Sequence, residues 1–255
     1  MAGITIERAS EPRSRGKIVF PVSNEVLSSN TKAKLAEVSG ITNTVFIAGG
    51  GTQVIAALSA LAAKNDVRRA ICVDSNPAQL RNLEKIAKIY NESQSSREYG
   101  EMLRSHSSEH RCDRKGLRWA ERTIAEGKPY LSRPVTIVLV ESDMKNFLCE
   151  ITEQGGYFIH LSNAPNYAGN YFRMTPFGGM VSSKDMLEAI LQNSAIEEGS
   201  IIYIRNFDRE PLILEKMDGK LSGMNPGDIS VKLAFDMLRF FARKTIKDTE
   251  YFGIS

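Results

Sequence analysis

The chain has 255 residues, of which 42% are hydrophobic and 25% charged, as in a globular protein with a buried core. Its 33 basic and 30 acidic residues leave a formal charge of only +3, which does not favour nucleic acid as a partner. No apolar stretch approaches the roughly 20 residues that cross a bilayer, and the N-terminus lacks the apolar core of a signal peptide. We therefore expect a cytoplasmic protein without a membrane span.

The first part of the chain predicts strands that alternate with helices. Residues 1–17 are polar and are expected to form a loose arm, and a helix should begin near Asn30 with capping oxygens from Ser28 to Asn30. The next elements, in order, are a strand in "NTVFIAGGG" (43–51), a helix in "TQVIAALSALAAKN" (52–65), a strand in "RRAICVDSN" (68–76) and a helix opening at Pro77. This alternation is typical of a parallel sheet with crossover helices.

The second part predicts an insertion and then more strands. Residues 91–134 are polar and much longer than the roughly 2–6 residues of such connections, with helical patches around 97–105 and 116–126. The later elements are strands in "PVTIVLVESD" (134–143), "GYFIHLSN" (156–163), "GSIIYIRNF" (199–207) and "PLILEKM" (211–217), with helices at 182–193 and 228–248. We expect one domain, 1–255, with a doubly wound, mostly parallel α/β sheet and a helical insertion.

A strand that runs into Gly49, Gly50 and Gly51 and then into a helix predicts a nucleotide site. The free backbone N–H groups of a helix N-terminus could lie against a ligand there. The alternative is a tight turn with close packing of strand and helix. Because Val54 stands where the dinucleotide fingerprint has its third glycine, NAD is disfavoured.

Acids follow the next two strands. Asp74 lies 23 residues after Gly51, near the offset at which an acid receives ribose hydroxyls, and its alternative role is to cap the following helix. After the third strand, Asp143 could accept the exocyclic amine of adenine while the N–H of Met144 faces a ring nitrogen. A helix-capping Asp143 is the equally weighted alternative.

Four segments in this order resemble the successive motifs of the class I S-adenosylmethionine-dependent transferases: "IAGGGTQ" (47–53), "VDSNPAQL" (73–80), "VESDMKNFL" (140–148) and "FIHLSNAPNY" (158–167). The stretch "CVDSNPAQLRNLEKIA" (72–87) further resembles the signature of 3-amino-3-carboxypropyl transferases, which are related to the enzyme that builds the homoserine head group of betaine lipids. The resemblance covers roughly residues 40–205. Those lipid enzymes are longer and membrane-associated, whereas this chain has no obvious apolar surface element. This departure from the family disfavours a diacylglycerol acceptor, and we expect a small one.

The resemblance also implies residue roles. Gly49, Gly50 and Gly51 would line the methionine and ribose part of S-adenosylmethionine, Asp74 the ribose, Asn76 the adenosine side, Asp143 and Met144 the adenine, and Ser162 and Asn163 the sulfonium. Tyr167 and Tyr171 would position a small amine- or hydroxyl-bearing acceptor, and Arg173 would hold a carboxylate. The expected reaction transfers the aminocarboxypropyl group and releases methylthioadenosine, without a metal. The alternatives are a methyltransferase and a non-catalytic nucleotide-binding protein, and a homo-oligomer is compatible with either.

Two weaker patterns remain. "SNAPNY" (162–167) resembles the Asn-Pro-Pro-Tyr motif of amino-methyltransferases that act on nucleic acid, but Tyr167 falls one position late. His106, His110 and Cys112 have the residue types of metal ligands but lack a fourth ligand at zinc-like spacing. His160 lies in an apolar strand and is expected to be a hydrogen-bonded core residue rather than a catalytic base.

Overall fold

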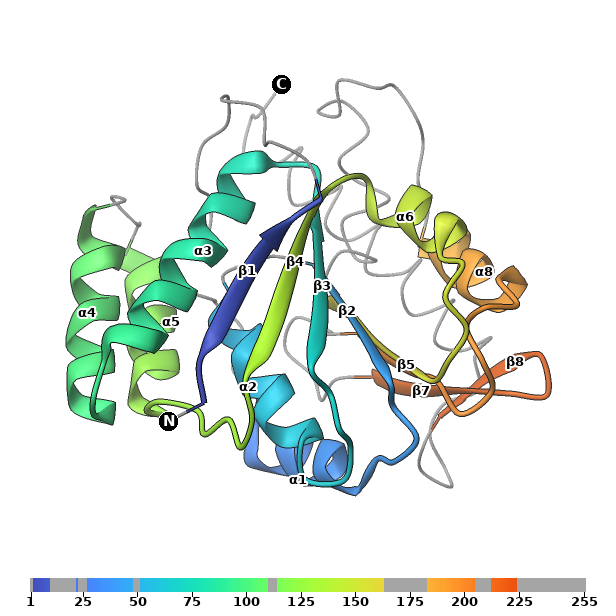
Figure 1. The fold of residues 1–255 in the computed structure, drawn as a ribbon, viewed down its shortest axis with the longest axis horizontal. Helices are drawn as coiled ribbons and strands as arrows, with labels where there is room; N and C mark the ends of the chain where they lie inside the picture. Colours follow the sequence, from blue (N-terminus) through green and yellow to red (C-terminus); the bar gives the residue numbers. More distant parts are fainter. Residues whose placement is uncertain are drawn as a thin grey trace, which may run out of the picture. The chain divides into compact units, whose positions relative to one another are not determined.

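The computed structural model describes residues 2–9, 22, 27–47, 51–109, 114–162, 183–204 and 212–223 (Figure 1). The chain divides into two compact units, Met1–Asp143 and Met144–Ser255, and the single domain expected from the sequence stays a prediction. Both units combine helices with strands, so the α/β class is confirmed. The double winding of the sheet stays a prediction. In the part of the chain described, no helix has the length and apolar character to cross a membrane.

The first unit is built on parallel strands. They are β1 (Ile4–Arg8), β2 (Asn43–Ile47), β3 (Arg69–Asp74) and β4 (Val135–Glu141), and they lie in the order β1-β4-β3-β2 (Figure 1). The pairs β1/β4, β4/β3 and β3/β2 are all parallel, and for β2, β3 and β4 the alternation of strands and helices predicts this arrangement. Their carboxyl ends therefore share one edge of the sheet, which is where ligands of open α/β sheets bind.

Helices of the first unit begin close to the predicted positions. They are α1 (Ser29–Glu37), α2 (Thr52–Leu61), α3 (Pro77–Glu92), α4 (Ser96–Glu109) and α5 (Arg114–Ala125). The side chain of Ser28 accepts a hydrogen bond from the backbone N–H of Thr31 at 3.1 Å, so the predicted cap of α1 is confirmed. The insertion contains the two predicted helices, α4 and α5, which pack against each other.

Residues 4–8 correct the prediction of a loose arm. They form β1, and Ile4 is buried. The Asn91 side chain at the end of α3 fixes both backbone groups of Ile4, accepting from its N–H and donating to its carbonyl at 2.8 Å each. The guanidinium of Arg8 binds the carboxylate of Glu84 on α3 through two nitrogens. The polar composition of the segment concealed the apolar pair Ile4 and Ile6, which have strand spacing.

The second unit contains parallel and antiparallel strands. They are β5 (Tyr157–Ser162), β6 (Ile201–Ile204), β7 (Leu212–Met217) and β8 (Lys220–Gly223), in that order. β5 and β6 are parallel, whereas β6/β7 and β7/β8 are antiparallel. The helices α6 (Met144–Glu150) and α8 (Ser183–Gln192) pack against each other. The predicted helix at 228–248 lies outside the described residues.

Candidate functional site

Both the backbone conformation and the packing require a glycine at position 51, directly before α2. This residue is the N-cap of α2 and has φ 71°, a left-handed conformation that side chains disfavour. A Cβ on Gly51 would lie 2.9 Å from Cδ1 of Leu83 and 3.2 Å from Cβ of Ile86, both on α3. The alternative predicted from sequence, a tight turn with close packing, therefore holds for Gly51, with α3 as its neighbour. Gly49 and Gly50 lie outside the described residues.

Asp74 ends β3 and begins a chain of local hydrogen bonds. Its Oδ1 accepts from the backbone N–H of Asn76 at 2.8 Å, and Oδ1 of Asn76 accepts from the N–H of Ala78 at 3.0 Å. Asn76 is thus the cap of α3, and Pro77 occupies the first helical turn. The capping role considered for Asp74 belongs to Asn76, while the predicted contact of Asn76 with adenosine stays a prediction.

The Asp74 carboxyl is partly shielded from water and incompletely hydrogen-bonded. Burial raises its pKa to about 6, although the Asn76 N–H acts in the opposite direction. Within the described part of the chain, that N–H is the one hydrogen-bond donor to this carboxylate. An ionised carboxylate has about four acceptor positions on two oxygens, so Asp74 retains capacity for further donors.

β4 places a second acid beside the first. Glu141, the last residue of β4, is the Cα partner of Asp74 in the parallel register, and both side chains are half-buried. The sequence reasoning missed Glu141, although it lies in the "VESDMKNFL" segment, because only the register shows that it neighbours Asp74. Asp143 follows two residues later and is also half-buried. The first unit therefore brings Gly51, Asp74 and these acids to the carboxyl ends of adjacent strands.

The remaining predicted site residues lie in the second unit or outside the described residues. Met144 begins α6 and is buried, and Ser162 ends β5, both in the second unit. Asn163, Tyr167, Tyr171 and Arg173 lie outside the described residues. Their predicted roles, like those of Met144 and Ser162, stay predictions.

His106 and His160 lie within the described residues. Nε2 of His106 lies 2.7 Å from Oδ1 of Asn82, in a buried contact between α4 and α3. His110 and Cys112 lie outside the described residues, and the described residues contain no group of three His, Cys, Asp or Glu side chains placed to hold a metal. His160 is buried and stacks on Tyr203 with ring centroids 4.5 Å apart, which confirms its location in the core, while its hydrogen bonding stays a prediction.

Comparison with known proteins identifies no family for this chain. No family model matches it, and no curated protein matches it. A solved structure that is similar is the rRNA methyltransferase AviRa from Streptomyces viridochromogenes, with 17% sequence identity, 69% of this chain and 70% of that chain covered, and a TM-score of 0.30. At that TM-score the similarity carries no functional conclusion.

Proposed function

We propose that this chain is an S-adenosylmethionine-dependent transferase that moves the 3-amino-3-carboxypropyl group to a small amine- or hydroxyl-bearing acceptor. The observation that carries the proposal is Asp74. Its carboxylate is desolvated, ends a parallel strand beside the glycine turn, and has one hydrogen-bond donor among the described residues. A pair of ribose hydroxyls would supply the donors that such a carboxylate lacks.

The local turn gives Asp74 the rigidity that ligand binding requires. Its Oδ1 is held by the Asn76 N–H, so the carboxylate is fixed before any ligand arrives and little side-chain entropy remains to be lost. Gly51, on the adjacent strand connection, keeps the start of α2 close to α3. A nucleoside at this edge would therefore meet a pre-formed turn rather than a flexible loop.

The choice of transferred group rests on the resemblance of "VDSNPAQL" to the aminocarboxypropyl transferases. S-adenosylmethionine supplies a sulfonium, which is already an activated electrophile. The acceptor nitrogen or oxygen forms a bond to the γ-carbon, the carbon–sulfur bond breaks with both electrons moving to sulfur, and the acceptor loses its proton. The residues of the chain then have to hold the adenosine and align the acceptor, and a strong acid–base pair is not required.

Product analysis tests the proposal. Purified protein is incubated with S-adenosylmethionine and a panel of small primary amines and alcohols, and the adenosine products are separated by chromatography. We expect methylthioadenosine, with the rate reduced in the Asp74→Ala variant. S-adenosylhomocysteine would instead identify a methyltransferase, and measurable binding without either product would identify a non-catalytic nucleotide-binding protein.

A further inference from the structure

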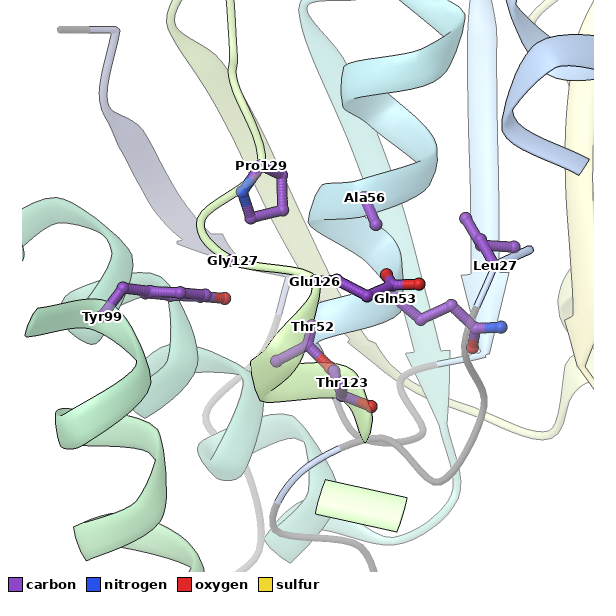
Figure 2. Close-up of a pocket in the computed structure, with 9 residues that line it drawn as sticks. All are labelled: Leu27, Thr52, Gln53, Ala56, Tyr99, Thr123, Glu126, Gly127 and Pro129. Atoms are coloured by element: carbon purple, nitrogen blue, oxygen red, sulfur yellow. The ribbon is translucent and has the colours of Figure 1, made fainter. Parts of the chain in front are cut away.

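A small cavity lies in the first unit at the start of α2 (Figure 2). Its walls come from the segment before α1, the first turns of α2, and the two helices of the insertion with the loop after α5. The residues that line it are Leu27, Thr52, Gln53, Ala56, Tyr99, Thr123, Glu126, Gly127 and Pro129. The insertion and α2, the helix that begins after Gly51, thus line one shared cavity.

Two hydroxyl groups in this cavity have unmet hydrogen-bonding capacity. Thr52 is 3% exposed and Tyr99 is 1% exposed, and neither Oγ1 of Thr52 nor the phenolic oxygen of Tyr99 has a hydrogen-bond partner in the described structure. In Figure 2 the tyrosine ring comes from α4 with its hydroxyl directed toward the side where the other lining residues lie. Burying such a group without a hydrogen-bond partner destabilises the folded state, so two together in one cavity need a physical explanation.

The size of the cavity selects the occupant. Its free volume is about 10 Å³. On this measure one water needs roughly 10–15 Å³, whereas a carboxylate or phosphate group would have to displace side chains. Cavities that stay dry have apolar walls, but these walls include two threonines, a glutamine and a glutamate. A single water molecule is therefore the occupant that fits both the volume and the chemistry.

We propose that an internal water molecule occupies this cavity and hydrogen-bonds to both Thr52 and Tyr99. Thr52 is the first residue of α2, directly after Gly51, and Tyr99 belongs to α4 of the insertion. The water would join the insertion to the helix turn that follows the glycines. The proposal is independent of the proposed function, because it rests on the cavity and its two hydroxyls.

A double-mutant cycle on folding stability tests the water bridge. Thr52→Val and Tyr99→Phe each remove one hydroxyl with little change in shape. If a water joins them, each single variant loses about fivefold in the folding equilibrium constant, because the water and the other hydroxyl are left short of a partner. The loss in folding equilibrium constant of the double variant should then be smaller than the product of the two single losses, by a factor of at least about three.

The control cycle pairs Tyr99→Phe with Thr44→Val. Thr44 is also buried, but its hydroxyl donates to the carbonyl of Arg69 at 3.1 Å, so this pair should show no coupling. Suppose that Thr52→Val and Tyr99→Phe each leave the folding equilibrium constant unchanged or raise it, and that the effect of the double variant equals the product of the two single effects. The two hydroxyls are then unpaired in the folded protein, and the proposal is overturned.

A crystal structure of the wild-type protein gives a second test. A water within hydrogen-bonding distance of both oxygens supports the bridge, and an empty cavity or any other group in it refutes the bridge.

Discussion

At the level of single residues, Asp74 experiences two opposing effects. The Asn76 N–H, 2.8 Å from Oδ1, favours the ionised carboxylate, whereas burial favours the neutral carboxyl. Burial is the larger effect, because the pKa is raised to about 6 from an ordinary value of 3.8. The carboxylate at neutral pH is therefore destabilised in the free protein, and a ligand that donates hydrogen bonds to it would offset part of that cost.

The raised pKa of Asp74 gives a pH dependence of binding. If the ionised carboxylate receives the ribose hydroxyls, protons compete with the ligand once the pH falls below about 6. Relative to the Asp74→Asn variant, the affinity of wild-type protein for S-adenosylmethionine should fall up to tenfold per pH unit below that value and level off above it. Calorimetric titrations from about pH 5 to about pH 7.5 measure the ratio of the wild-type affinity to that of the Asp74→Asn variant. A ratio that stays constant over this range would show that Asp74 does not titrate against the ligand.

Gly51 has a separate, structural requirement. Gly51→Ala should lower the free energy of unfolding by about 3 kcal/mol, since it combines the left-handed backbone with contact against Leu83. Gly40→Ala is the matched control, because Gly40 has φ 79° but nothing within 4 Å of an added Cβ, and it should lose only about 1–2 kcal/mol. Urea denaturation compares the two. Equal losses would mean that α3 does not restrict this turn.

At the level of elements, the C-terminus of α8 is capped from a strand. Lys216 on β7 is buried, and its Nζ donates to the backbone carbonyls of Ile190, Asn193 and Ile196 at 3.2, 3.0 and 2.7 Å. The last carbonyls of a helix have no partner within the helix, and the ammonium group of Lys216 supplies donors to the carbonyl of Ile190 in the last turn of α8 and to two carbonyls that follow it. Burial lowers the pKa of Lys216, which shows that its charge is held at a cost in solvation.

Replacing Lys216 should weaken the second unit. Lys216→Met keeps most of the side-chain volume but removes all three hydrogen bonds, and we expect a loss of about 2–3 kcal/mol in unfolding free energy. Lys220→Met is the control, since Lys220 on β8 is exposed and its replacement should change stability by about 0.5 kcal/mol or less. Thermal or urea unfolding provides the measurement, and similar losses in both variants would contradict the capping role.

The elements that the sequence predicts well are those with a strong local signal. α1 and α3 begin at the expected positions because Ser28 and the pair Asn76-Pro77 are local capping signals. β1 was missed because it is an edge strand held by Asn91, a contact distant in sequence. β8 was also missed, although Asp218 and Gly219 both have positive φ and form the Asp-Gly turn that signals a hairpin.

At the level of the whole molecule, the sequence predicts the topology of the first unit better than its site. Alternating strands and helices are sufficient to indicate parallel strands, because crossover connections follow general rules. The site depends on which residues become neighbours across strands, and Glu141 shows the difficulty, because its position beside Asp74 depends on the register of β3 and β4. Likewise, no local pattern reveals that Gly51 faces Leu83 and Ile86.

The proposed function depends on a contact between Asp74 and ribose hydroxyls. A double-mutant-type thermodynamic cycle, which alters one group on the ligand and one on the protein, measures that contact. Isothermal titration calorimetry compares S-adenosylmethionine with its 2′-deoxyribose analogue on wild-type protein and on Asp74→Asn. We expect the missing hydroxyl to cost the wild-type protein about 1–3 kcal/mol of binding free energy and to cost the variant much less. Equal losses in the two proteins, or no binding of S-adenosylmethionine to the wild type, would contradict the account.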